Sequence, residues 1–243
     1  MKIALISDIH GIYVALTAVL QDLERHQPDT LICLGDIATI GPQPKEVLST
    51  LQTLDCVFVQ GNHDAAMLNP EKAAAFKIHP ALLSNLEWAI SQLEPQDIAF
   101  LESFQINYEL NLDADKKLFC FHASPINNID IILATTPRDI LDKFLASTNV
   151  DVMAGGHTHI QMLRKYNGRL LINPGSVGTS FVTPPPTETP ILSPWVEYAI
   201  VECKNGAVTV NFHRLPMDLE ALFDSVQASS MPNREWWLAQ YHP

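Results

Sequence analysis

The chain reads Ile3-Ala4-Leu5-Ile6-Ser7-Asp8-Ile9-His10 just before its first predicted helix. The apolar run at 3 to 6 predicts a buried strand, and the apolar spacing across residues 12 to 25 predicts an amphipathic helix after it. Asp8 and His10 therefore lie in the turn that joins strand to helix. Ligands collect at such turns in α/β sheets, so this stretch indicates both a fold and a site.

The alternation of strand and helix continues along the chain. A strand at 30 to 34 precedes a helix with Pro44 in its first turn, and a third strand covers 56 to 59. This βαβαβ order predicts a parallel sheet with helices on both faces, because parallel strands need long crossover connections. Asp36 and Asn62 follow the second and third strands, at the same edge of the sheet as Asp8.

The next part of the chain changes character. Residues 65 to 104 are rich in Ala and Leu and contain three prolines, which predicts a helical insertion over the edge or mouth of the sheet. Beyond it, the sequence predicts strands at 106 to 112, 117 to 122, 150 to 154 and 169 to 172, a helix at 137 to 147, and a hairpin turn at Asn167-Gly168.

The last part of the chain contains a loop, a hairpin and a tail. The Pro-rich segment 183 to 194 predicts a loop. Strands at 196 to 203 and 207 to 215 form a predicted hairpin, which suggests a second sheet. Residues 216 to 243 predict a short helix and a tail that contains Trp236-Trp237. We expect a single domain that spans residues 1 to 243.

Composition limits the classes of partner. The sequence is 47% hydrophobic, and 15 Lys and Arg against 27 Asp and Glu give a net charge of -12. This charge disfavours long nucleic acids and anionic membranes, since both are polyanions. No apolar run approaches the ~20 residues of a membrane span. The four cysteines lie singly, mostly in apolar runs, which is typical of reduced thiols, and we expect a cytoplasmic protein.

Seven residues of metal-binding types follow predicted strands. They are Asp8, His10, Asp36, Asn62, His122, His157 and His159. In extended backbone, both side chains of Asp8-x-His10 would leave the same face of the chain, and His157-x-His159 has the same spacing. Carboxylate, amide and imidazole ligands without a thiolate suit Mn, Fe, Co, Ni or Zn. The set is large enough to serve two metal ions.

Each of these residues taken alone has a simpler explanation. A single Asp after a strand is more often a turn residue or a helix cap. Four other histidines lack such neighbours, and we expect them to be ordinary surface or core residues: His26, His79, His213 and His242. The order and setting of the whole set, rather than any one member, indicate a metal centre.

Five ordered blocks resemble the motifs of the calcineurin-like metallophosphoesterases: Asp8-x-His10, Gly35-Asp36, Gly61-Asn62-His63-Asp64, His122 and Gly156-His157-x-His159. Within that superfamily, the run Asn173-Pro174-Gly175-Ser176-Val177-Gly178 is similar to the small bacterial phosphodiesterase group. The resemblance covers roughly residues 1 to 180. It implies a four-layered α/β/β/α sandwich with a dinuclear metal centre between the two sheets.

The resemblance also implies a role for each matching residue. One divalent ion would be held by Asp8, His10, Asp36 and His159, and the second by Asp36, Asn62, His122 and His157. Metals lower the pKa of bound water toward ~7, so a bridging hydroxide would attack phosphorus. His63 would contact the phosphate and stabilise or protonate the leaving oxygen, and Asp64 would orient His63.

The chain departs from the family pattern at two places, and the first departure narrows the substrate class. Protein phosphatases of the superfamily carry an arginine after the Gly-Asp pair, whereas this chain reads Gly35-Asp36-Ile37-Ala38-Thr39. The basic residue that follows the Asn-Pro-Gly-Ser-Val-Gly run in the smaller group is also absent from Gly178-Thr179-Ser180-Phe181-Val182. The first departure disfavours a phosphoprotein substrate.

The sequence therefore predicts a metal-dependent phosphoesterase for a small phosphodiester or nucleotide-type substrate. A nuclease of the same superfamily is one alternative, and the charge of -12 disfavours it. A non-catalytic scaffold, in which the metal pocket binds another protein, is the second. Scaffolds of this fold tend to lose ligands or the histidine of the Gly-Asn-His block, and this chain keeps both. The native metals, the physiological substrate and a homo-oligomeric state are left open.

Overall fold

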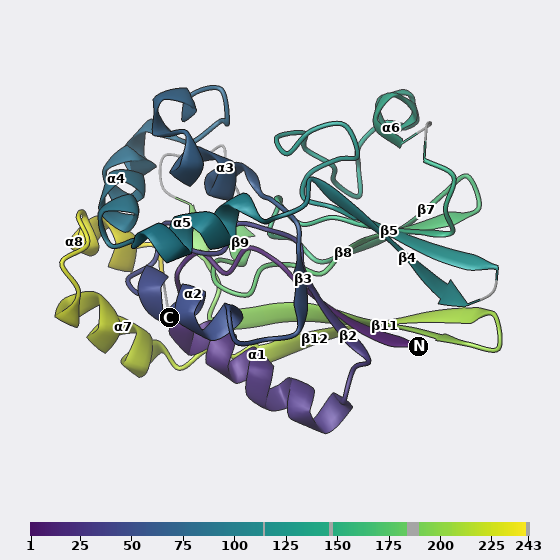
Figure 1. The fold of residues 1–243 in the computed structure, drawn as a ribbon, viewed down its shortest axis with the longest axis horizontal. Helices are drawn as coiled ribbons and strands as arrows, with labels where there is room; N and C mark the ends of the chain where they lie inside the picture. Colours follow the sequence, from purple (N-terminus) through teal and green to yellow (C-terminus); the bar gives the residue numbers. More distant parts are fainter. Residues whose placement is uncertain (114, 146–147, 184–189, 242–243) are drawn as a thin grey trace.

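The computed structural model describes residues 1–113, 115–145, 148–183 and 190–241. Two five-stranded sheets form its centre (Figure 1). The first sheet has the order β12 (Ala207–Pro216), β11 (Trp195–Lys204), β1 (Lys2–Ile6), β2 (Thr30–Cys33) and β3 (Cys56–Phe58). The second has the order β4 (Asn107–Asp113), β5 (Lys116–Phe121), β6 (Val152–Ala154), β8 (Arg169–Asn173) and β7 (Met162–Tyr166).

The two sheets pack face to face with helices outside them. Residues such as Leu5, Ile32, Leu118 and Val152 meet between the sheets and form one buried cluster. A second cluster joins the outer face of the first sheet to its helices, and a third joins the second sheet to α6 (Arg138–Leu145). This arrangement confirms the four-layered α/β/β/α sandwich. The inner face of the first sheet is covered by the other sheet, so helices on both of its faces were a wrong expectation.

The predicted βαβαβ unit is present. Strands β1, β2 and β3 pair in parallel, connected by α1 (Tyr13–His26) and α2 (Pro44–Leu51). Helix α1 buries Leu16, Val19 and Leu23 on one face, which is the spacing of an amphipathic helix on a sheet. The carboxyl ends of the three strands therefore lie at one edge of the sheet. The predicted metal ligands of this sheet come directly after those ends.

The segment between β3 and β4 is helical, as expected. It contains α3 (Asn62–Leu68), 3-10 turns at Pro70–Lys72 and Pro80–Leu82, α4 (Leu83–Ser91) and α5 (Pro95–Glu102). The helices start earlier than the sequence indicated. Because α3 begins at Asn62, this residue and His63 lie in the first turn of a helix, which fixes their backbone more firmly than a loop would.

The C-terminal hairpin does not form a second sheet, contrary to expectation. Strands β11 and β12 pair across the two-residue turn Asn205-Gly206, and β11 also pairs antiparallel with β1. Residues 196 to 201 of β11 are all buried, so this strand needs a neighbour at each edge and both faces covered. The alternating exposure of β12 is that of an edge strand.

Two further expectations change near the C-terminal end. The predicted loop at 183 to 194 contains part of a small antiparallel pair, β9 (Phe181–Thr183) with β10 (Ile191–Leu192), while residues 184–189 lie outside the described part. The tail forms α7 (Leu219–Ala228) and α8 (Arg234–Leu238), and Trp237 is fully buried in the domain. In the described ranges, we find no helix with the length and apolarity of a membrane span.

Candidate metal centre

The expected ligands meet where strands of both sheets end. Asp8 follows β1 and Asp36 follows β2 in the first sheet, while His122 follows β5 and His157 follows β6 in the second. The loops are joined to one another by backbone hydrogen bonds, among them Asp8 N–H to the Gly35 carbonyl oxygen at 2.9 Å. The carboxyl ends of the parallel strands in both sheets thus form one edge of the molecule.

The backbone at these residues is not extended. Asp8, His10, Asp36, His157 and His159 all have positive φ angles, between 51° and 65°. Left-handed backbone is uncommon outside glycine and clusters at functional sites. The extended backbone assumed for Asp8-x-His10 and His157-x-His159 was therefore wrong. The structure sends His157 and His159 to two different groups of side chains.

The first group combines ends of both sheets. The ligand atoms of Asp8, His10 and His159 lie within 4.8 Å of one another, and all three residues are buried. Nε2 of His159 is 3.3 Å from Oδ1 of Asp8 and 3.1 Å from Nε2 of His10. Ligands of one zinc ion in tetrahedral geometry are about 3.4 Å apart, so this group could hold one divalent ion.

The second group is built from Asp36, His122 and His157, whose ligand atoms also lie within 4.8 Å of one another. Nε2 of His122 is 3.3 Å from Oδ2 of Asp36 and 3.1 Å from Oδ1 of Asn62. All seven expected ligands are thereby accounted for in two neighbouring groups.

Asp36 joins the two groups. Its Oδ2 atom lies 3.3 Å from His122 Nε2 in the second group and 4.0 Å from His10 Nε2 in the first. Its Oδ1 atom accepts the backbone N–H of His63 at 2.8 Å, which fixes the carboxylate plane. A carboxylate held between two sets of ligands has the position of a bridge.

Backbone carbonyls set the orientation of two imidazoles. Nδ1 of His159 lies 2.7 Å from the Thr179 carbonyl oxygen, and Nδ1 of His122 lies 2.7 Å from that of Leu34. With Nδ1–H donating to these oxygens, both rings turn Nε2 into the centre. Such hydrogen bonds commonly hold metal-binding histidines in place. Burial lowers the pKa of both rings, but the charge of Asp36 raises that of His122 to about 9 and the charge of Asp8 raises that of His159, so a bound cation would take the place of a proton on Nε2.

The donor set fits divalent cations. Oδ1 of Asp8 is buried and accepts no hydrogen bond from the described residues, and Nε2 of His10 lies 3.1 Å from Nε2 of His159. Burial would raise the pKa of Asp8, but the charge of His159 lowers it to about 2. Burial and then His122 lower the pKa of His157 to about 4. A carboxylate and an imidazole ready to donate lone pairs at neutral pH are what bound cations require.

His63 is positioned by Thr39 rather than by Asp64. Nδ1 of His63 lies 2.9 Å from Oγ1 of Thr39, which is also 3.4 Å from Nδ1 of His10. Asp64 accepts three backbone N–H groups instead, from Asp36, Ile37 and Gly61, at 2.8 to 3.0 Å. No sequence signal singled out Thr39.

The three hydrogen bonds of Asp64 tie two loops together. One loop carries Asp36, and the other leads into the first turn of α3, where Asn62 lies. Burial, followed by the charge of Asp36, raises the pKa of Asp64 to about 6. The loops also touch closely, since a Cβ atom on Gly61 would collide with the carboxylate of Asp36. Glycine is therefore required at 61 for steric reasons.

A cavity of about 280 Å³ opens over the two groups. Its polar lining includes His10, Asp36, Asn62, His63, His157 and His159, and its apolar lining includes Ile131, Leu133, Ile160 and Phe181. Lys77, His79 and Leu82 come from the helical segment after α3 and complete one wall. His79 was expected to have no role, and its place in this wall could not be inferred from a lone histidine among apolar residues.

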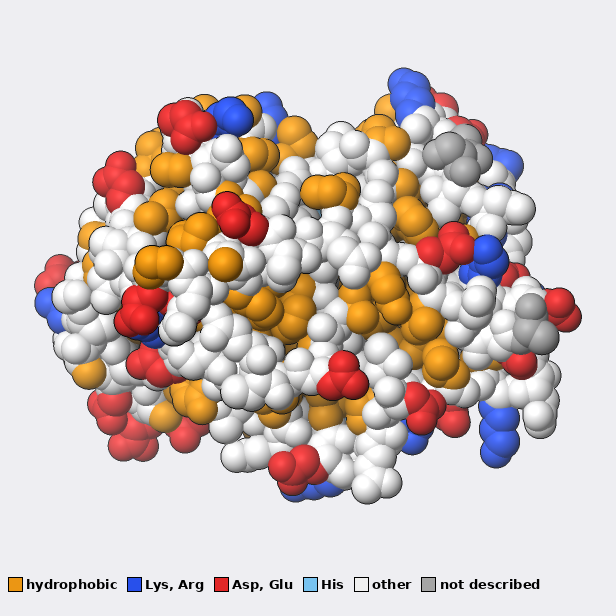
Figure 2. Space-filling model, viewed as in Figure 1, with side chains coloured by type: hydrophobic (Ala, Val, Ile, Leu, Met, Phe, Trp, Pro, Cys, Tyr) orange, Lys and Arg blue, Asp and Glu red, His pale blue; other side chains and the backbone are white. Residues whose placement is uncertain are grey.

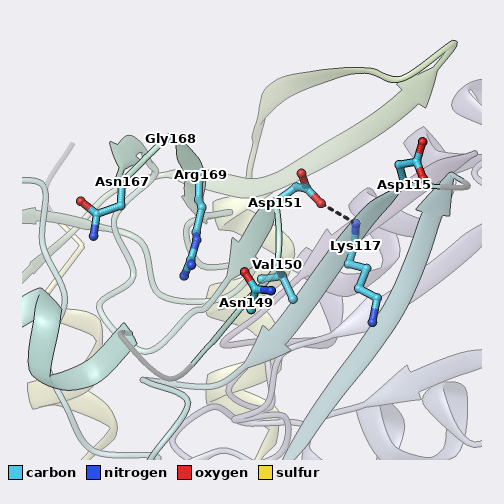
Figure 3. Close-up of a pocket in the computed structure, with 8 residues that line it drawn as sticks. All are labelled: Asp115, Lys117, Asn149, Val150, Asp151, Asn167, Gly168 and Arg169. Atoms are coloured by element: carbon cyan, nitrogen blue, oxygen red, sulfur yellow. Dashed lines mark hydrogen bonds between the residues drawn. The ribbon is translucent and has the colours of Figure 1, made fainter.

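A larger hollow, about 460 Å³, lies elsewhere and contains none of the expected ligands (Figure 3). Lys117, Asp151 and Arg169 line it, next to the amino ends of β5, β6 and β8. Those three strands are parallel, so this hollow lies at the opposite edge of the second sheet from His122. The volume of a hollow alone does not identify the site here.

The fold and the buried polar cluster agree with a comparison of families. A model of the calcineurin-like phosphoesterase superfamily domain matches residues 1–205, which include all the expected ligands and His63. The chain belongs to that superfamily. Membership confirms the resemblance found in the sequence and implies divalent metal ions.

The chain is also similar to individual proteins. An uncharacterized protein of Methanocaldococcus jannaschii, MJ0912, is 32% identical over 175 residues, which are 72% of this chain and 69% of that protein. A symmetrical bis(5'-nucleosyl)-tetraphosphatase of Cronobacter sakazakii is 32% identical over 173 residues, 64% of this chain. The match spans 56% of that enzyme's length. The crystal structure of a metallophosphoesterase from Sphaerobacter thermophilus gives a TM-score of 0.74 at 26% identity, covering 99% of this chain and 98% of that one.

Replacing Asp64 should loosen the centre without removing any expected ligand. An asparagine side chain at this position has one acceptor oxygen and would turn an N–H₂ group toward backbone donors. We expect Asp64→Asn to lower the free energy of unfolding of metal-free protein by about 2–5 kcal/mol. It should also weaken Mn²⁺ binding, measured by calorimetric titration of chelator-treated protein.

Asp97 provides a matched control for this variant. It is buried and likewise accepts a backbone N–H from three residues earlier, Glu94, at the start of α5. Asp97→Asn should destabilise the protein but leave Mn²⁺ affinity unchanged. Equal effects of the two variants on Mn²⁺ affinity would show that Asp64 acts on stability alone.

Proposed function

We propose that this protein is a metal-dependent phosphoesterase that hydrolyses a small phosphodiester or a nucleotide-type phosphoester. One observation carries the proposal: two groups of buried metal-binding side chains adjoin at Asp36, at the base of a cavity. Superfamily membership and the distant tetraphosphatase relative support hydrolysis of such esters.

The proposed centre holds two divalent ions. The first takes Asp8, His10, Asp36 and His159, and the second takes Asp36, Asn62, His122 and His157. The mixed nitrogen and oxygen ligands suit Mn, Fe, Zn, Ni or Co. When bound, two such ions supply Lewis-acid activation of water and of the phosphoryl group. The protein's part is to fix the ligands on short loops and to exclude bulk water by burial.

His63 is the proposed catalytic acid or hydrogen-bond donor. Burial lowers the pKa of His63, so the ring is neutral at pH 7 and carries one proton. If the Thr39 hydroxyl donates to Nδ1, that proton lies on Nε2 and is available to a leaving oxygen. Thr39 would thus be a positioning residue for the reaction, and Asp64 acts on loop geometry rather than on His63.

The cavity supports a substrate with an anionic and an apolar part. Lys77 is the one Lys or Arg among the described residues of its lining, in a protein of net charge -12. The apolar lining includes Ile131, Ile160 and Phe181. A phosphate beside Lys77 and a base or aromatic group on the apolar residues would match both parts. The volume, about 280 Å³, favours a small substrate.

A long nucleic acid fits the surface less well. On the face in Figure 2, Lys and Arg side chains are isolated among acidic ones, and the described residues there form no continuous basic patch. Binding of a polyanion depends on several Lys or Arg contacts to phosphates. A KM for small esters that does not change with salt would agree with this view.

The test is a panel of aryl diesters, cyclic nucleotides and dinucleoside polyphosphates, run with Mn, Ni, Co, Zn and Mg. We expect turnover with at least one metal, and we expect Asp36→Asn to lose both turnover and bound metal because it removes the proposed bridge. An Asp36→Asn protein with full metal content and activity contradicts the bridging role. Metal-loaded wild type without turnover on any ester would instead support the non-catalytic scaffold.

The role of His63 can be separated from metal binding. His63→Ala should lower kcat by ~10²-fold or more on esters with poor leaving groups, which is the usual size of acid catalysis. Esters with good leaving groups should be affected less, and metal content should stay at the wild-type level. Wild-type kcat on a poor leaving group would rule out this role.

Lys77 should contribute to substrate affinity rather than to chemistry. Lys77→Ala is expected to raise KM for dinucleoside polyphosphates by ~10-fold, as one lost charge-assisted contact would, with little change for an aryl diester. Lys72→Ala is the control, because Lys72 is an exposed lysine of the same segment outside the cavity. Equal KM values in the two variants would exclude a phosphate contact by Lys77.

A further inference from the structure

A third group of metal-binding side chains, Asp22, His26 and His213, lies on the outer face of the first sheet. Asp22 and His26 are on α1, and His213 is on β12. Their ligand atoms lie within 4.8 Å of one another. Figure 1 shows α1 running beneath this sheet, and α1 contacts β11 there. The candidate metal centre, in contrast, lies at the strand ends between the two sheets.

Two of the three side chains already have the spacing of metal ligands. Nε2 of His26 is 3.5 Å from Oδ2 of Asp22, close to the ~3.4 Å between two ligands of a tetrahedral zinc ion. The i, i+4 positions place both on one face of α1. The hydroxyl of Tyr198 donates to Oδ2 of Asp22 and fixes the carboxylate, as is common for ligating carboxylates.

The third side chain has a nitrogen without a hydrogen bond. Nε2 of His213 is buried and finds no hydrogen-bond partner in the described part of the chain. The ring is held by a parallel stack on Tyr198, with centroids 4.5 Å apart, and meets the ring of His26 edge-on at 4.6 Å. A buried ring nitrogen that lacks a partner is unfavourable, and a cation beside His26 and Asp22 would supply one.

We propose that Asp22, His26 and His213 form a separate site for one divalent cation of the zinc type. Two imidazoles and one carboxylate suit Zn²⁺, Co²⁺ or Ni²⁺, with water completing the coordination. The sequence separates α1 from β12 by most of the chain. A bound ion would therefore fasten the last turn of α1 to the edge strand of the first sheet.

Two nearby cations bear on this site. Arg25 pairs with Oδ1 of Asp22 at 3.3 Å, but its side chain is 81% exposed and can move into solvent. Lys2 donates its Nζ to the backbone carbonyl oxygen of His26 rather than to a ligand side chain. Oδ2 of Asp22, which faces His26, is not involved in either contact. Removing Arg25 should therefore preserve or tighten cation binding.

The experiment counts bound zinc per chain. Full-length protein is stripped with a chelator, reloaded with Zn²⁺, freed of unbound metal by gel filtration and assayed by atomic absorption. His26→Ala removes a partly exposed ligand, and His213→Phe keeps a ring on Tyr198 while removing both nitrogens. Each variant should bind one zinc ion fewer per chain than the wild type, whereas Arg25→Ala should bind the wild-type number.

A second readout guards against misfolding. In the metal-free state, His26→Ala should keep the circular dichroism spectrum of the wild type, and Zn²⁺ should raise its Tm less than that of the wild type. Phosphoester turnover of His26→Ala should equal that of the wild type, because the site is outside the cavity. Equal zinc counts in wild type, His26→Ala and His213→Phe would overturn the proposal, whatever the turnover.

Discussion

The centre depends on left-handed backbone at the ends of the strands. Asp8, His10, Asp36, His157 and His159 all adopt it, at a cost of about 1–2 kcal/mol for each residue. Such conformations persist only where surrounding contacts fix them. Here the loops hold one another: the Asp8 and His10 N–H groups bond to the Gly35 and Asp36 carbonyl oxygens, and the Gly156 N–H bonds to that of His122. These hydrogen bonds between the loops of each sheet therefore fix the directions of the side chains.

Much of this centre could be predicted because ligand identity and strand order are local properties. Parallel strands end at one edge, so Asp8, Asp36 and Asn62 had to lie near one another once the βαβαβ pattern was read. Local spacing could not show that His157 and His159 diverge, because both residues have positive φ angles rather than the extended backbone that the spacing assumed. Nor could it identify Thr39, because Thr39 and His63 are 24 residues apart in sequence and their contact depends on the tertiary structure.

The hairpin of β11 and β12 shows a second limit of prediction from sequence. Its turn and its pairing are local and were predicted, whereas its sheet depends on partners nearly two hundred residues away, as in the pair Leu5 and Ala199. The mostly apolar run at 196 to 201, which is buried throughout in the structure, was the sign in the sequence of an internal strand. That placement also brings His213 over the end of α1, so the group of Asp22, His26 and His213 could not be inferred from sequence.

Asn62 connects the ligands to the wall of the cavity. Its Oδ1 atom faces His122, while its Nδ2 group donates to the Phe76 carbonyl oxygen at 3.0 Å. The next residue, Lys77, has a φ of 60°, a strained value for a lysine. A cation bound to Oδ1 of Asn62 would also fix the plane of the side-chain amide. Because Nδ2 of this amide donates to the Phe76 carbonyl oxygen, the backbone next to Lys77 would be fixed as well. By thermodynamic linkage, a substrate that holds Lys77 in this conformation would raise the affinity for the cation by the same factor as the cation raises the affinity for the substrate. Substrate and metal affinity are expected to be coupled through one side-chain amide.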